Sequence, residues 1–241
     1  MKKLLCGLLC ASAVLPSVAS VEAEVANIDV IAIDSGLKNT IVAIPGLDLA
    51  GGDLVISNLV KTTNLKQGDK LVAFSDGKYE SWALDADGGH WTQAANRFFI
   101  SASGTESEDT TAASLVRMST GSGIWLQRSV FAKGNPFYIY ATHVDSPTTT
   151  VDANSTVLLG NPKVTNKTPT ISGAQNGDQI IVPDATAFLS KRVFTYNGSA
   201  WQYMDSSDVL KTGLPEGLIV AGTGFWYKAA DAGSTRSVSW E

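Results

Sequence analysis

The sequence predicts an all-β protein made of two degenerate antiparallel units in tandem. Apolar residues alternate with polar ones or form short runs that end at turn residues, a pattern typical of strands. Asp-Gly and Asn-Gly pairs stand between such runs, as in hairpins. The same series of short motifs also occurs twice in the same order. The units are expected to form either a sandwich or a barrel-like body.

Strands are expected where the alternation is clearest, at residues 25–34, 40–44, 70–74, 137–142 and 179–182. Asp76-Gly77 and Asn197-Gly198 suit the positive φ angles of type I′ hairpin turns. The best helical candidates, 111–118 and 206–210, are too short for an isolated helix to be stable. Helix is therefore expected to be a minor component.

The duplication rests on three motifs that recur in register along the chain. Each copy has a Gly-Asp pair before a strand, a tryptophan in a hairpin, and a closing Gly-x-Gly-apolar-Trp segment. The two copies fall out of step mainly at a polar insertion, 101–111. The matched residues are Gly68, Asp69, Trp91, Gly121, Gly123 and Trp125 in the first copy, and Gly177, Asp178, Trp201, Gly222, Gly224 and Trp226 in the second.

These motifs divide the chain into a signal peptide at 1–23, a first β-unit at 24–144, a connector at 145–151 and a second β-unit at 152–241. The connector is rich in Thr, Ser and Pro, a composition typical of an exposed link. The units either pack as a pseudo-twofold pair or pool their strands into one merged domain.

The N-terminal segment has the three parts of a secretory signal peptide: Lys2 and Lys3, an apolar run at 4–15, and small residues up to Ser20 or Ala23. The run is shorter than the roughly 20 residues that a membrane-spanning helix requires. We therefore expect export to the periplasm, the outer surface or the medium, with no transmembrane segment in the mature chain. Both cysteines lie in this segment, so the mature chain is predicted to be free of thiols.

The charge balance argues against two classes of partner. The chain has a formal net charge of −5, and its lysines and arginines do not cluster. Nucleic acids and anionic membranes both attract proteins through a concentrated positive patch. We therefore expect no nucleic-acid partner.

The repeated Gly-x-Gly-apolar-Trp segment is the strongest pattern in the chain. A phosphate-binding glycine loop would need a helix N-terminus after it, and here β-forming residues follow. We expect structural roles: glycines that allow a bulge or a close backbone approach, and tryptophans that enter the core. The residues concerned are Gly121, Gly123, Trp125, Gly222, Gly224 and Trp226.

No pattern supports a catalytic residue, a metal site or a cofactor. His90 and His143 are too few for a zinc site, which uses three or four His, Cys or acidic ligands. The acidic turn at 85–89 resembles the start of a calcium loop, but its closing position is Asn96 instead of glutamate. A polar hairpin turn is the preferred interpretation.

The repeated modules resemble a set of uncharacterised secreted β-rich proteins of Gram-negative-type bacteria that carry Gly-Asp, Trp and Gly-x-Gly-aromatic-Trp motifs. The resemblance spans most of the mature chain and implies the same modular architecture. No catalytic residue comes with it.

Export, repetition and the lack of a catalytic pattern favour a non-enzymatic envelope or extracellular protein with a structural or adhesive role. Its partners would be copies of itself, other envelope proteins or glycans. One alternative is a carbohydrate-binding module that uses surplus tryptophans, with Trp82, Trp91 and Trp201 as candidate ligand-binding residues. Another alternative is a glycoside hydrolase with dispersed carboxylates.

Overall fold

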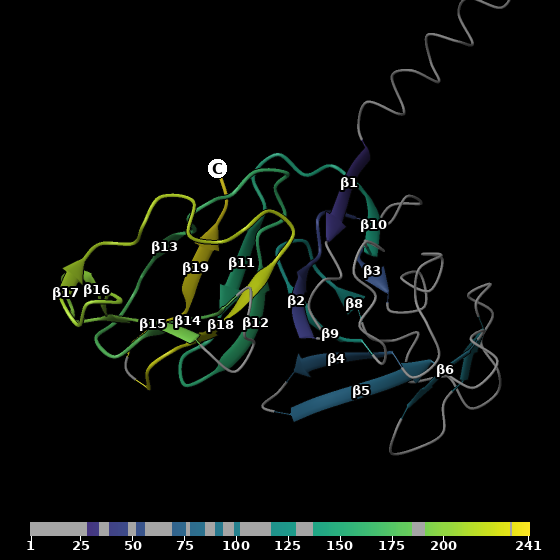
Figure 1. The fold of residues 1–241 in the computed structure, drawn as a ribbon, viewed down its shortest axis with the longest axis horizontal. Coiled ribbons are helices and arrows are strands. Elements are labelled where there is room, and N and C mark those ends of the chain that lie inside the picture. The colour runs from purple at the N-terminus through teal and green to yellow at the C-terminus, as the bar shows by residue number, and fades with distance from the viewer. Residues whose placement is uncertain are drawn as a thin grey trace, which may run out of the picture.

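The computed structural model describes residues 28–33, 39–47, 52–55, 69–75, 78–84, 90–93, 99–101, 117–128, 137–184, 191–231 and 233–241. Within these ranges the protein is all-β, as expected, and every strand pairing is antiparallel (Figure 1). The described ranges include no helix that is long and apolar enough to span a membrane.

The strands follow one another along the chain in two comparable series. The first series is β1 (Ile28–Ile33), β2 (Asn39–Ala43), β3 (Leu54–Val55), β4 (Lys70–Ser75), β5 (Lys78–Leu84), β6 (His90–Gln93), β7 (Phe99–Ser101), β8 (Arg117–Met118), β9 (Gly123–Gln127) and β10 (Phe137–Thr142). The second series is β11 (Thr148–Val151), β12 (Thr156–Gly160), β13 (Thr170–Ser172), β14 (Gln179–Pro183), β15 (Lys191–Tyr196), β16 (Trp201–Met204), β17 (Leu210–Thr212), β18 (Gly224–Lys228) and β19 (Arg236–Ser239).

Each series forms a six-stranded sheet with the same strand order. The first sheet runs β2-β9-β4-β5-β6-β7 and the second runs β12-β18-β14-β15-β16-β17 (Figure 1). Each Gly-Asp strand, β4 or β14, lies between the strand that follows it and the closing tryptophan strand. The segments around Leu71 and Trp125 therefore have the same strand neighbours as those around Ile180 and Trp226, as the duplication predicts.

The pairing register is also the same in the two sheets. Lys70 pairs with Gln127, and at the matching positions Gln179 pairs with Lys228. The hairpin tryptophans match too, because Leu84 pairs with Trp91 as Tyr196 pairs with Trp201. The two halves of the chain therefore form the same pattern of strand pairing, although few of their residues are identical.

Smaller pairings repeat beside the sheets. β1 pairs with β10 in the first half, and β11 pairs with β19 in the second. β3 pairs with β8, and an isolated bridge between Lys167 and Ile219 occurs at the corresponding place in the second half. We call the first series unit 1 and the second series unit 2.

Each unit buries apolar side chains of its own strands. In unit 2 the cluster includes Ile180, Phe194, Phe225, Val238 and Trp240, from β14, β15, β18, β19 and the residue after it. In unit 1, Leu71, Ile124 and Leu126 from β4 and β9 are buried together with Ile139 from β10. Burying one such large side chain stabilises a fold by about 1.5–3 kcal/mol, so these faces supply much of the driving force for folding.

Part of the expected connector is a strand. Residues 148–151 form β11, which pairs with β19, and Val151 is fully buried. The Thr-rich composition suggested an exposed link, but threonine is β-branched and suits an extended, half-buried edge equally well.

The turn at Asn197-Gly198 occurs where it was expected but has a different form. Four residues, 197–200, separate β15 from β16, and only Gly198 has a positive φ, of 93°. The Asn197 side-chain oxygen accepts hydrogen bonds from the backbone amides of Ser199 and Ala200. This side-chain bonding stabilises a longer loop than the type I′ turn that was predicted.

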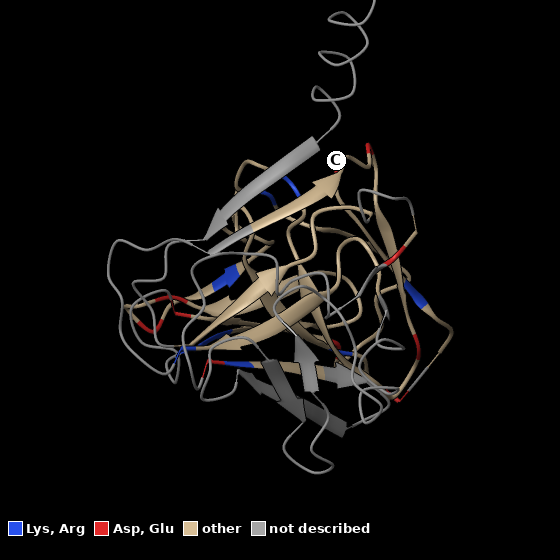
Figure 2. Ribbon diagram, turned by 90° about the vertical axis from the view of Figure 1, so that its right-hand side faces the viewer, with Lys and Arg blue, Asp and Glu red and all other residues tan. Residues whose placement is uncertain are grey.

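The helical candidate at 206–210 is wrong, because a turn leads there directly into β17. The last two residues of the other candidate, Arg117 and Met118, form β8. The signal peptide, the turn at 85–89 and residues 102–111 of the insertion lie outside the described residues. Charged residues are dispersed over the described ribbon (Figure 2).

Candidate functional site

The repeated glycines form a junction between the two units. Gly121 and Gly222 have positive φ angles of 84° and 69°, which favour glycine. The amide of Ala43 in β2 donates to the carbonyl of Gly222, at 2.8 Å, and the amide of Gly160 in β12 donates to that of Gly121, also at 2.8 Å. The first glycine of each motif thus supplies a hydrogen-bond acceptor to the other unit.

The second glycine of each motif lies where the backbones come close. A Cβ added at Gly123 would lie 2.9 Å from the Leu159 carbonyl oxygen and 2.9 Å from the Ile41 side chain. A Cβ added at Gly224 would lie 2.3 Å from the same Leu159 oxygen, which here belongs to the paired strand β12 of its own unit, and 2.6 Å from the Ile41 side chain of unit 1. The close backbone approach expected of these glycines is therefore present. At Gly123 it is made across the junction, whereas at Gly224 it is made to the paired strand within unit 2, and the group met across the junction is the Ile41 side chain.

Trp125 and Trp226 do not enter the cores, contrary to expectation. Both are half-buried, whereas Ile124 and Leu126, beside Trp125, are buried, as are Phe225 and Tyr227, beside Trp226. Strand alternation separates two faces but does not say which face the core covers when both are apolar. In unit 1 the core covers the strand face that carries Ile124 and Leu126. In unit 2 it covers the face that carries Phe225 and Tyr227.

The two tryptophans meet each other across the junction. Their ring centroids are 6.3 Å apart and their planes form an angle of 80°, an edge-to-face arrangement. Ile41 and Leu158, which pair with them in the sheets, are 1% and 4% exposed. The tryptophan faces of both sheets are therefore covered beside the junction. Farther from it, on β15, which is separated from β18 by β14, Val193 is 37% exposed.

The remaining tryptophans occupy different environments. Trp240 is fully buried against Phe225. Trp201 is half-buried and packs on Tyr227 and on Tyr196, whose ring centroid is 5.4 Å away. The backbones of Trp82 and Trp91 lie in β5 and β6, but their side chains are outside the described set.

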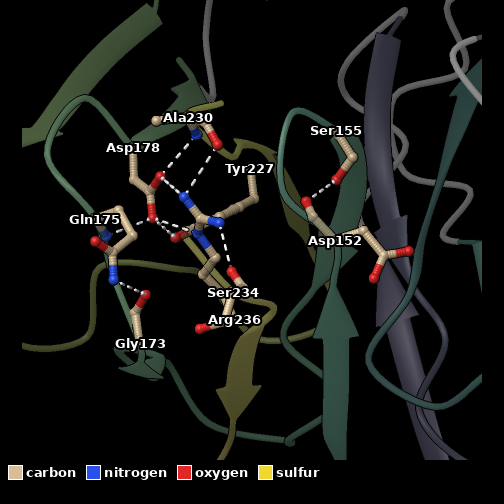
Figure 3. A network of polar contacts seen from close by, with 9 residues as sticks. All are labelled: Asp152, Ser155, Gly173, Gln175, Asp178, Tyr227, Ala230, Ser234 and Arg236. Carbon is tan, nitrogen blue, oxygen red and sulfur yellow. Dashed lines mark hydrogen bonds and ion pairs between the residues drawn. The ribbon is translucent and has the colours of Figure 1, made fainter. Parts of the chain in front are cut away.

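Unit 2 also contains a fully buried ion pair centred on the aspartate of its Gly-Asp motif (Figure 3). The Asp178 carboxylate accepts two hydrogen bonds from Arg236, at 2.8 and 3.0 Å, and one from the Tyr227 hydroxyl at 2.7 Å. The backbone amides of Gln175 and Ala230 also donate to it. The network ties β14, β18 and β19 together.

The network keeps its members in fixed protonation states. Burial alone would favour the neutral acid, but the hydrogen bonds from Arg236, the two amides and Tyr227 outweigh it and lower the pKa of Asp178. Burial and the adjacent carboxylate raise the pKa of Tyr227, and the hydrogen bond to Asp178 raises the pKa of Arg236. The carboxylate is thus held in its ionised form at neutral pH and is sealed from solvent.

Unit 1 has a matching buried pair with a different source of the arginine. Asp69, the equivalent of Asp178, lies 2.9 Å from Nε of Arg128, and both side chains are buried. Arg128 directly follows β9, whereas Arg236 starts β19. The Gly-Asp motif was recognised in the sequence, but its partner could not be, because the two copies place the arginine at unrelated positions.

Among the residues with described side chains, no group of three His, Cys, Asp or Glu could hold a metal ion. His143 is exposed and contacts Asp145 at 3.1 Å. The His90 side chain lies outside the described set. No family model, no curated protein and no solved structure matches this chain.

Proposed function

We propose that the protein is an exported, non-enzymatic component of the cell envelope or extracellular space, with a structural or adhesive role. Its body would be a pseudo-twofold pair of β-units. The observation that carries this proposal is the use of the repeated Gly-x-Gly motif: its carbonyls and its missing side chains join one unit to the other.

The reciprocity of the contacts supports the pseudo-twofold arrangement. Ala43 in β2 and Gly160 in β12 occupy equivalent positions. Ala43 pairs with Gly123, and Gly160 pairs with the matching glycine of unit 2, Gly224. Each donates to the first glycine of the opposite unit. Equivalent residues that exchange equivalent contacts are typical of a twofold interface.

The buried charges support a structural role as well. Each unit places the aspartate of its Gly-Asp motif in an internal ion pair with arginine. A general acid or base must reach a substrate and change protonation near the working pH. The Asp178 carboxylate is buried and held in its ionised form, and both aspartates hold strands together through their arginines.

Cell fractionation followed by negative-stain microscopy tests this proposal. The native protein is expected in the envelope or medium, without its first 20 or 23 residues, and in assemblies or on surfaces. Recovery from the cytosol with an intact N-terminus would overturn it.

A carbohydrate-binding module is the second candidate, favoured by a row of half-buried aromatic residues in unit 2. Tyr196, Trp201 and Tyr203 lie on β15 and β16 and pack beside Phe194 and Tyr227 of the core. Flat sugar faces stack on such rings. The perpendicular Trp125 and Trp226 offer no comparable platform.

A glycan array with purified protein separates the two candidates. Binding that disappears in Trp201→Ala but persists in Tyr140→Ala, an exposed aromatic of unit 1, would establish the carbohydrate-binding role. No binding above background would leave the structural role as the proposal.

A further inference from the structure

We infer that the junction surface of unit 2 is self-complementary and can pair with unit 2 of a second copy of this chain. The inference rests on the pseudo-twofold pairing proposed above. It goes further by naming a partner outside the molecule and by predicting which of the two units can make that contact.

The junction residues of unit 2 match those of unit 1 almost one for one. Gly121 and Gly123 correspond to Gly222 and Gly224, and Trp125 corresponds to Trp226. Strands β2 and β12 form reciprocal bridges, Val42 with Thr223 and Leu159 with Ser122. A second unit 2 would therefore offer unit 2 the same amide, the same carbonyl and a tryptophan at the same strand position as unit 1 offers now.

One substitution between the units makes this pairing selective. A Cβ added at Gly160 would lie 2.5 Å from both the Cα and the Cβ of Ala43, too close for real atoms. Position 43 in unit 1 and position 160 in unit 2 face each other, so the junction holds one alanine against one glycine. Two facing copies of unit 2 bring glycine against glycine, whereas two facing copies of unit 1 would bring two alanines into collision.

Within one chain, unit 1 already occupies this surface. Pairing between chains therefore requires that unit 1 be displaced while unit 2 stays intact. Gly123→Val is designed to do this, because a Cβ at this position already comes within 2.9 Å of the Leu159 carbonyl oxygen across the junction, and the crowding at Ile41 Cγ2, also 2.9 Å away, lies within unit 1 and leaves the strands of unit 2 unchanged. The backbone at Gly123 has no positive φ, so valine adds no conformational strain there.

Light scattering on the full mature chain measures the result. Gly123→Val is expected to show twice the monomer mass at concentrations where the unchanged chain is monomeric. Adding Gly160→Ala places two alanines face to face in the dimer, so the double variant is expected to return to the monomer mass. Circular dichroism checks that each variant keeps its β-structure.

A folded Gly123→Val chain that stays monomeric would overturn the inference. Equal dimerisation of the double variant would also overturn it, because association would then be non-specific apolar contact.

If Gly123→Val does not fold, a second experiment uses the unchanged chain with a protease site inserted at 143–147. The chain is cleaved there, and the fragments are studied by native mass spectrometry. Homodimers of the second fragment, which contains unit 2, are expected, and no homodimers of the first fragment, which contains unit 1. If every dimer contains one first and one second fragment, self-pairing of unit 2 is refuted. Loss of the contact between Trp125 and Trp226 in the unchanged chain would instead count against the pseudo-twofold arrangement itself.

Discussion

At the scale of single residues, stability in unit 2 depends on a carboxylate with a complete set of donors. Asp178 receives five hydrogen bonds, two of them from Arg236, and neither side chain is exposed. A buried ion pair of this kind adds little over an apolar replacement, but removing one member leaves the other charge without compensation. The aspartate is therefore more sensitive to substitution than its motif alone suggests.

Asp178→Asn is expected to lower the free energy of unfolding by about 3–5 kcal/mol, because Arg236 is left buried without a counter-charge. Urea titration monitored by tryptophan fluorescence measures the change. Asp231→Asn is the matched control, since Asp231 is exposed, and it should have almost no effect. Equal stability of the two variants would mean that the pair is not buried in solution.

The same carboxylate predicts how stability depends on pH. Its pKa is lower in the folded protein than the ordinary value of 3.8, so the unfolded chain binds the proton more readily. The contribution of Asp178 to the free energy of unfolding is fully present at pH values above this ordinary pKa. It is lost as the pH falls from there through the lower pKa of the folded state. Urea melts at several pH values should therefore show a steeper acid loss for the unchanged chain than for Asp178→Asn. Parallel curves would contradict the shift.

At the scale of elements, the Gly-x-Gly-Trp strand fulfils two roles on its two faces. One face carries Ile124 and Leu126, or Phe225 and Tyr227, into the core of its own unit. The other face brings one tryptophan from each unit into edge-to-face contact. The glycines before the strand allow the two backbones to approach.

Gly224→Ala should reduce stability by about 1–3 kcal/mol, because its Cβ would overlap the backbone oxygen of Leu159, which cannot move aside as a side chain could. Gly213→Ala serves as the control. An added Cβ meets no atom within 4 Å there, so the only expected loss is the backbone strain of placing alanine at a positive φ. Thermal unfolding of both variants gives the comparison. A smaller loss at Gly224 than at Gly213 would argue against the close approach.

The tryptophan pair should show measurable coupling. A double-mutant cycle of Trp125→Ala and Trp226→Ala is expected to give an interaction energy of about 1 kcal/mol, the usual size for an edge-to-face aromatic pair. Trp125→Ala combined with Val209→Ala, at an exposed turn of unit 2, should be additive. Additivity in both cycles would mean that the rings do not meet.

How far the sequence predicts these elements differs from one to the next. Alternation located β2, β4, β10 and β14, and the repeated motifs identified matching strands, because both signals are local. The side of the sheet taken by Trp125 could not be predicted, since two apolar faces look alike in one sequence. The arginine partner of Asp178 could not be predicted either, because it comes from a strand distant along the chain and absent from the motif.

At the scale of the whole molecule, duplication allows each unit to cover the apolar face of the other. The tryptophan face of one sheet would be open to water in a single unit, and in the pair Ile41 and Leu158 are almost fully buried. The hydrogen bonds from Ala43 and Gly160 complete strands that would otherwise end at an unpaired edge. In the proposed pseudo-twofold arrangement, these two amides bind across one junction.

Amide hydrogen exchange at Ala43 and Gly160, followed by NMR, tests that claim most directly. Both amides are expected to be strongly protected, and Gly224→Ala should weaken the protection of both together, because one junction holds them. Exchange of either amide as fast as that of exposed turns, or loss of protection at one position alone, would contradict the joined arrangement of the two units.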